Sequence, residues 1–144
     1  MQYRHLLVPL DFNDPGSTTL QTALDLAALH HAQTTLMYVI EAIDDSDDDD
    51  AENDIESFYA QLEADVREKV RAIAARFEQA GLSVRAEIVV GHGPREIVQY
   101  SATESVDLIV MRSERVDLTQ PDRRVTSVSH QVSLFCQCPV MLVK

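Results

Sequence analysis

The sequence predicts one α/β domain, spanning residues 1–144, in which five parallel strands form a single sheet and helices cover both of its faces. Two observations predict this fold. Short apolar runs alternate along the chain with segments whose apolar residues recur every three or four positions. The chain of 144 residues is also long enough to bury one substantial core. Because each parallel strand must be reached through a crossover helix, the expected arrangement is doubly wound.

The strand signals are short runs rich in Val, Ile and Leu, as expected of strands that are buried on both faces. They lie at residues 6–10, 35–40, 84–90, 106–111 and 140–143. The helix signals are apolar stripes at residues 20–27, 55–77, 97–102 and 128–135. Gly81 follows the long second stripe as an expected C-cap, and Pro94 suits the first turn of the helix after the third strand.

The chain is acidic, with a formal net charge of −12 at pH 7. This balance argues against a nucleic-acid partner, since phosphate backbones are bound by patches of Lys and Arg. Eight of the 24 acidic residues fall between Asp44 and Asp54. Like charges at that density repel one another, so we expect a flexible, solvated loop at about residues 44–54.

Two groups of residues are candidates for metal sites. One group matches the ligand positions of a calcium-binding EF-hand loop: Asp45, Asp47, Asp49, Ala51, Asn53 and Glu56. The glycine that such a loop needs is replaced by Asp50, and a strand rather than a helix precedes it. The other group, His130 with Cys136 and Cys138, lacks a zinc-site spacing. No metal site is predicted, and loose screening by cations is the alternative for the acidic stretch.

The sequence also bears on the compartment. No apolar run approaches the roughly 20 residues needed to cross a bilayer, so no membrane insertion is expected. The N-terminus lacks the pattern of a signal peptide, and Cys136 and Cys138 are too close in sequence to suggest a disulfide framework. We therefore expect a cytoplasmic protein.

In an open parallel sheet, ligands bind outside the carboxyl ends of the strands, at the point where the winding reverses. The residues expected there are Asp11, the segment 39–41, Gly91 and the stretch that begins at Met111. That last stretch joins the fourth strand to the last helix, where a phosphate would normally lie. Two other five-stranded classes fit less well. A phosphorelay receiver needs an Asp at the end of the third strand, and a flavodoxin binds its phosphate after the first.

The stretch from residue 111 to 127 resembles the phosphate loop of the universal stress protein (UspA-like) family. Nucleotide-binding members of that family carry glycine, two residues, glycine, nine residues, and then glycine followed by Ser or Thr. The same spacing here holds Arg112, Arg115, Val125 and Thr126. Further similarities to the family lie at residues 7–11, 38–41, 91–97, 107–111 and 138–140. The resemblance implies a fold of the adenine-nucleotide-hydrolase type.

In ATP-binding relatives, Asp11 and the backbone at Val39 would hold the adenosine, and the glycine loop would hold the phosphates. Glycines allow backbone N–H groups to approach phosphate oxygens closely. Arginine side chains fill that space, and a β-branched valine resists a positive φ. The resemblance thus implies a degenerate nucleotide site at Pro9, Asp11, Val39, Met111, Arg112, Arg115, Val125, Thr126 and Ser127.

We therefore predict a non-catalytic binding or regulatory protein that is not an enzyme, does not bind ATP tightly and requires no cofactor. One alternative is a sensor that binds AMP, ATP or another anion through the guanidinium groups of Arg112 and Arg115. A second is a weak nucleotide hydrolase, although only Asp11 lies near the loop as a base. The arginines could instead pair with nearby acids of the loop, and Asp11 could accept hydrogen bonds from the following turn. The Thr126 hydroxyl could simply cap the helix.

The last strand is expected at an exposed sheet edge, which proteins usually cover or charge. In the family this edge pairs with its copy across a two-fold axis, so the resemblance implies a homodimer. Pro139 and Lys144 could instead simply guard this edge. The edge residues are Val140, Met141, Leu142 and Val143. An additional protein partner, which the sequence does not identify, is also compatible with a regulatory protein.

Overall fold

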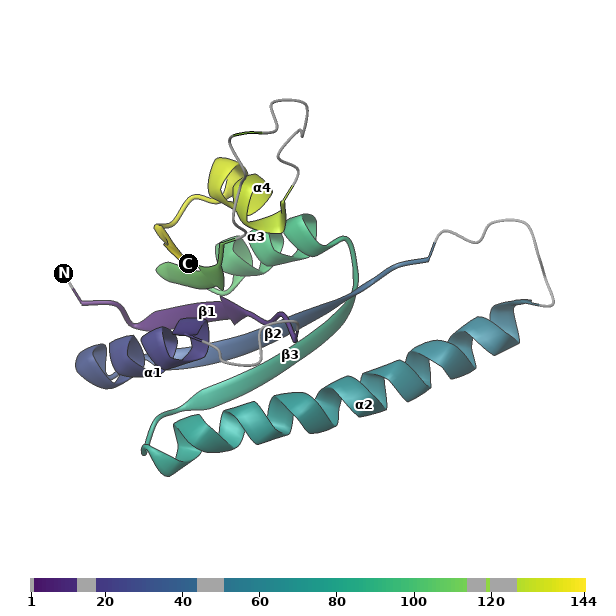
Figure 1. The fold of residues 1–144 in the computed structure, drawn as a ribbon, viewed down its shortest axis with the longest axis horizontal. Coiled ribbons are helices and arrows are strands. Elements are labelled where there is room, and N and C mark those ends of the chain that lie inside the picture. The colour runs from purple at the N-terminus through teal and green to yellow at the C-terminus, as the bar shows by residue number, and fades with distance from the viewer. Residues whose placement is uncertain (1, 13–17, 44–50, 114–118, 120–126) are drawn as a thin grey trace.

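A computed structural model describes residues 2–12, 18–43, 51–113, 119 and 127–144, with the side chains of 51–53 left aside. Strands and helices alternate along the described residues (Figure 1). The strands are β1 (His5–Pro9), β2 (Gln33–Glu41), β3 (Val84–Gly91), β4 (Leu108–Arg112) and β5 (Val140–Val143). The helices are α1 (Thr18–His30), α2 (Ala51–Gln79), α3 (Gly93–Thr103) and α4 (Val128–Phe135). This order confirms the predicted alternation.

The strands form one parallel sheet in the order β3-β2-β1-β4-β5. In the centre, Leu7 of β1 lies opposite Thr35 of β2 and Ile109 of β4. The chain builds the sheet outward from β1 in one direction through β2 and β3, and then in the other through β4 and β5. The winding therefore reverses between β1 and β4, and the carboxyl ends of these two strands define the expected position of a ligand.

Helices cover both faces of the sheet, as predicted: α1 and α2 lie on one side, and α3 and α4 on the other (Figure 1). The alternation of side chains along β1 separates the two cores. Leu6 and Val8 pack with the buried side chains of α1 and α2, whereas Leu7 packs with those of α3 and α4. All three are fully buried, so both faces of the central strand contribute to the core.

Helix α2 corrects the predicted acidic loop. It begins at Ala51, so residues 51–54 belong to a helix rather than to the loop expected at 44–54. Two effects favour the earlier start: alanine has the highest helix propensity, and an acidic residue near a helix N-terminus, such as Asp54, is favoured by the helix dipole. Residues 44–50, with most of the acidic run, lie outside the described part of the chain.

The end of α2 confirms the predicted stop at Gly81, which has a φ of 77°. Its N–H donates to the carbonyl of Glu78 at 2.9 Å, and the N–H of Leu82 donates to that of Phe77 at 3.0 Å. This pair of bonds is a Schellman motif, which satisfies the last carbonyls of a helix and requires a left-handed residue. Glycine adopts that conformation without the steric cost of a Cβ.

Strand β4 begins later than predicted, at Leu108 instead of residue 106. The reason is that the N–H of Val106 still donates to the carbonyl of Ser101 in α3, at 3.1 Å. The strand also extends one residue further, so that Arg112 is its last residue and lies opposite Val143 of β5. Arg112 therefore emerges from a fixed strand end.

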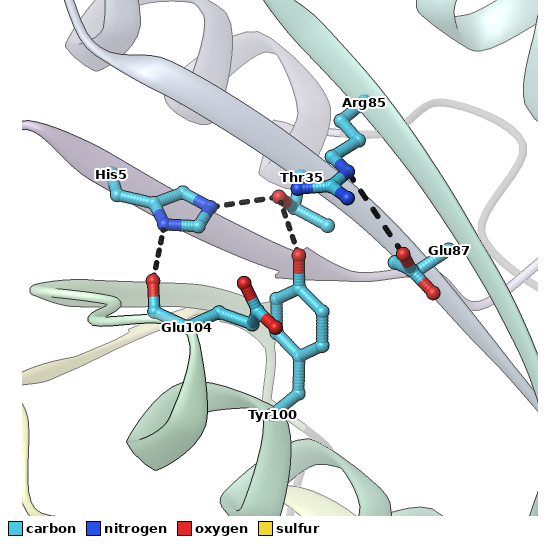
Figure 2. Close-up of polar contacts among 6 residues, drawn as sticks. All are labelled: His5, Thr35, Arg85, Glu87, Tyr100 and Glu104. Atoms are coloured by element: carbon cyan, nitrogen blue, oxygen red, sulfur yellow. Dashed lines mark hydrogen bonds and ion pairs between the residues drawn. The ribbon is translucent and has the colours of Figure 1, made fainter.

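A polar network joins β1, β2 and the end of α3 on one face of the sheet (Figure 2). His5 Nδ1 lies 3.0 Å from the carbonyl oxygen of Glu104, and because that oxygen can only accept, the ring must donate from this nitrogen. In the neutral ring, Nε2 then accepts from the Thr35 hydroxyl at 2.8 Å. The hydroxyl of Tyr100 is 3.2 Å from the same Thr35 oxygen and completes the chain. This network anchors the C-terminal part of α3 near the amino ends of the strands.

Candidate functional site

A cavity of about 380 Å³ lies at the carboxyl ends of the central strands, where the winding reverses. Its apolar lining includes Met37 of β2, Ile97 of α3 and Met111 of β4, which also belong to the core under α3 and α4. Polar groups lie along its rim. This volume is within the usual range of small-molecule sites, about 300–1,000 Å³, and an apolar floor with a few polar groups is typical of them.

Five of the nine predicted site residues line this cavity: Pro9, Asp11, Val39, Met111 and Arg112. They come from three neighbouring strands, so the fold brings together residues about 100 positions apart in the chain. Arg115, Val125 and Thr126 lie outside the described residues. Ser127 is described but acts as a helix cap beside the cavity.

Asp11 and Arg112 form an ion pair across the point where the winding reverses. The distance between Arg112 Nη1 and Asp11 Oδ2 is 3.0 Å. The Arg112 side chain is 34% exposed and the Asp11 side chain is 43% exposed. Because the pair is in contact with solvent, it contributes little to stability, about 0–1 kcal/mol. Its importance is positional, because it places one cation and one anion at the rim of the cavity.

The N-terminus of α4 lies beside the same cavity, and its residues Val128 and Ser129 line it. The N-cap residue is Ser127, with φ −63° and ψ 150°, and its hydroxyl accepts from the N–H of His130 at 3.2 Å. The capping role that the sequence left open for Thr126, which lies outside the described residues, belongs to Ser127. A cap needs an extended residue immediately before the first helical turn, and Ser127 occupies that position.

A carboxylate from β2 occupies the N-terminus of α3. Glu41 Oε1 accepts from the N–H of Gly93 at 2.9 Å, and Glu41 Oε2 lies 3.9 Å from Nδ1 of His92. His92 is the N-cap residue of α3 but makes no side-chain cap bond. Glu41 and Gly93 both line the cavity. The sequence placed residue 41 near the carboxyl end of a strand but did not indicate this capping contact, because it depends on how β2 and α3 lie side by side.

An aromatic pair borders the cavity near β1 and β2. The rings of Phe12 and Tyr38 are stacked, with centroids 4.8 Å apart and planes at 13°. Lys69 of α2 places its Nζ 5.2 Å from the centroid of the Phe12 ring, a cation–π distance. The part of the cavity lining formed by Phe12 and Tyr38 therefore packs against α2. The sequence pattern alone did not reveal this contact.

The described residues contain no cluster of three or more His, Cys, Asp or Glu side chains that could hold a metal. Cys136 and Cys138 are both free thiols. Burial, together with the neighbouring Cys136, raises the pKa of the Cys138 thiol to about 11. A thiol with a raised pKa is a weak nucleophile near neutral pH, since the thiolate is the reactive form. Over the described chain, no helix is long and apolar enough to span a membrane.

A doubly wound parallel sheet with a cavity at its winding reversal, lined by Asp11 and Arg112, places the chain in the class of small doubly wound α/β domains. The sequence profile described as "Universal stress protein family" matches residues 2–144, and the chain belongs to that family. This confirms the resemblance drawn from the sequence.

Universal stress protein MJ0531 of Methanocaldococcus jannaschii is 25% identical over 148 residues, which cover 99% of this chain and 82% of the relative. Among solved structures, the universal stress protein UspA from Lactobacillus plantarum has a TM-score of 0.84 at 21% identity, covering 100% of this chain and 99% of that one. These similarities confirm the fold.

Complexes with cAMP, dAMP and AMP are among the similar solved structures. The universal stress protein from Archaeoglobus fulgidus in complex with dAMP has a TM-score of 0.69 at 18% identity, covering 100% of both chains. A family protein from Arabidopsis thaliana with AMP bound has a TM-score of 0.68 at 17% identity, covering 98% of this chain and 91% of that one.

Proposed function

We propose that this chain is a non-catalytic regulatory protein that binds an adenine nucleoside monophosphate in the cavity beside Asp11 and Arg112, and that it binds ATP only weakly. The observation that carries this proposal is the cavity itself: an apolar floor at the winding reversal, with one ion pair from β1 and β4 at its rim. Its volume of about 380 Å³ suits a nucleoside monophosphate.

The two similar structures with dAMP and AMP support the choice of ligand class. Both proteins share the fold of this chain, and a ligand in this fold belongs at the carboxyl ends of the strands. The apolar lining of Met37, Ile97 and Met111 suits the faces of an aromatic base.

The ion pair suits the polar part of a nucleotide. The Asp11 carboxylate can accept hydrogen bonds from ribose hydroxyls. Arg112 has five N–H donors, so it can hold Asp11 and still donate to one phosphate group. A single guanidinium at a strand end supplies donors for one phosphate more readily than for three.

The preference against ATP follows from the sequence of the phosphate loop. Arginine and valine stand at the family's three glycine positions, as Arg112, Arg115 and Val125. A cradle for the outer phosphates requires backbone N–H groups that approach the oxygens closely, and Cβ atoms hinder this approach. We therefore expect the loss of the glycines to weaken ATP binding more than AMP binding.

The non-catalytic assignment is supported by the partners of the two carboxylates in the cavity. Asp11 is held by Arg112, and Glu41 is held by the backbone N–H of Gly93. Each therefore already accepts a donor from the protein. If the protein were instead a nucleotide hydrolase, it would release phosphate from ATP faster than its Asp11→Asn variant does.

Titration calorimetry with AMP and ATP at one fixed salt concentration tests the proposal. We expect AMP to bind at least about tenfold more tightly than ATP, a difference of about 1.4 kcal/mol. Asp11→Asn should weaken AMP binding. Asp65→Asn is the matched control, because Asp65 is an exposed residue of α2 whose carboxylate accepts from Gln61 at 3.2 Å. ATP binding as tight as AMP binding, or no binding of either nucleotide, would overturn the proposal.

The variant Arg112→Gly separates a ligand role of this arginine from a blocking role. If Arg112 holds the phosphate, the variant loses affinity for AMP, which is the result that we expect. If Arg112 merely fills the phosphate space, the variant gains affinity for ATP and AMP binding is unchanged. The second result would contradict the role assigned to Arg112.

A further inference from the structure

Glu41 is a third charged residue that lines the cavity, and it takes no part in the ion pair of Asp11 and Arg112. Side chains alternate along a strand, so Met37, Val39 and Glu41 of β2 face the same side of the sheet. Met37 and Val39 pack in the core under α3 and α4, and all three residues line the cavity. Glu41 is thus the last of three residues on this face of β2 that run from the core to the edge of the cavity, where α3 begins.

The Glu41 carboxylate is held in place although its side chain is 65% exposed. Its Oε1 accepts from Gly93 N at 2.9 Å. A Cβ at residue 93 would lie 2.9 Å from that same oxygen, so the contact uses the absence of a side chain there. The side chain of His92, the N-cap residue, makes no capping hydrogen bond, so the capping acceptor is Glu41. The carboxylate is therefore a fixed feature of the cavity wall.

This arrangement favours one orientation of a nucleotide bound in the cavity. The N-terminus of a helix normally attracts anions, but Glu41 already supplies a negative charge at the start of α3. A phosphate at that end would meet like charge, whereas Arg112 offers a cation at the other end. Because β1 lies between β2 and β4, Glu41 and Arg112 lie on opposite sides of the central strand. We therefore place the base of the nucleotide nearer Glu41 and its phosphate nearer Arg112.

We infer that Glu41 is a specificity-determining residue that selects a purine with an amino group at ring position 6 over a purine with an oxo group there. The inference rests on the proposed function. An ionised carboxylate can only accept hydrogen bonds. An amino group at ring position 6 donates to it, whereas an oxo group there places two acceptors against each other. The N1–H of a 6-oxopurine lies one ring position away, so the preference applies to a carboxylate that faces position 6.

The test compares AMP with inosine monophosphate (IMP), which carries an oxo group at ring position 6 and a proton on N1. We expect the wild-type protein to bind AMP about tenfold or more tightly than IMP. Glu41→Gln keeps an oxygen that can accept from Gly93 and adds an amide donor for the oxo group. In this variant the AMP-to-IMP affinity ratio should fall toward one. Calorimetry gives each ratio within one protein preparation, so partial unfolding of a variant does not affect it.

Glu87→Gln is the matched control, because it removes the same charge from β3, where Glu87 lies 4.0 Å from Arg85 and does not line the cavity (Figure 2). Its ratio should equal that of the wild type. Adenosine and inosine provide a second measurement on the unmodified protein: the preference should persist without a phosphate, since it arises at the base end.

The outcomes separate the two proposals. If the wild type binds AMP and IMP equally, or if Glu41→Gln retains the wild-type ratio, the role of Glu41 is wrong while the proposed function stands. If the wild type binds neither nucleotide, both are wrong.

Discussion

Two adjacent threonines of β2 face opposite sides of the sheet and differ in their hydrogen bonds. Both are fully buried. Thr35 lies between His5 Nε2 and the Tyr100 hydroxyl, at 2.8 and 3.2 Å. The Thr34 hydroxyl has no hydrogen-bond partner among the residues that the structure describes. A buried polar group without a partner is destabilising, so two similar side chains contribute differently to stability.

We predict that Thr35→Val lowers the free energy of unfolding by about 1–3 kcal/mol, because it leaves the ring nitrogen of His5 and the hydroxyl of Tyr100 without their shared partner. Thr34→Val is the control with the same change in shape, and it should be neutral or stabilising. Urea denaturation of both variants measures the difference. Equal destabilisation by the two substitutions would contradict the account of the network.

At the residue scale, the sequence predicted which residues lie at the site better than it predicted what they contact. Asp11 and Arg112 were expected at the carboxyl ends of two strands, and both line the cavity. Their ion pair could not be foreseen, because it joins residues 101 positions apart and requires β1 and β4 to be neighbours. The contact of Glu41 with Gly93 was missed for the same reason.

At the scale of single elements, helix α4 begins at the cavity and depends on one capping side chain. Ser127→Ala removes the acceptor for the N–H of His130, and we predict a loss of about 1 kcal/mol in the free energy of unfolding. Ser133→Ala is the matched control, since the Ser133 hydroxyl donates to a carbonyl within the helix and should be nearly neutral when removed. Thermal unfolding of both variants measures the effect, and a Ser127→Ala protein as stable as its control would argue against this cap.

Periodicity and turn residues predicted the elements themselves, including α4 at residues 128–135 and the stop of α2 at Gly81. Two of the boundary errors have different causes. The charge density of the acidic run suggested that the loop reaches residue 54, whereas helix propensity starts α2 at Ala51. The apolar Val106 looked like strand, but its N–H bonds to the end of α3.

At the scale of the whole molecule, β5 is an edge strand that exposes apolar side chains. Met141 is 38% exposed and Leu142 is 39% exposed. Phe135, the last residue of α4, is 67% exposed. Unpaired, apolar edges are usually covered, and we propose that a second copy of the chain covers this one, as the family resemblance implied.

Size-exclusion chromatography with light scattering should therefore give about twice the monomer mass of 16.1 kDa. Met141→Glu should shift the protein to the monomer, because it places a charge in the apolar contact. Val90→Glu is the control: Val90 is 48% exposed on β3, the opposite edge, and its substitution should leave the dimer intact. A wild-type mass near 16 kDa would contradict the dimer.

The central claim is that this cavity binds an adenine nucleoside monophosphate in preference to ATP. The most direct measurement is a calorimetric titration of the unmodified protein with AMP and with ATP in the same buffer. The account predicts a saturable AMP isotherm and an affinity for ATP that is at least about tenfold weaker. Low-micromolar binding of ATP at an affinity equal to or above that of AMP would contradict it.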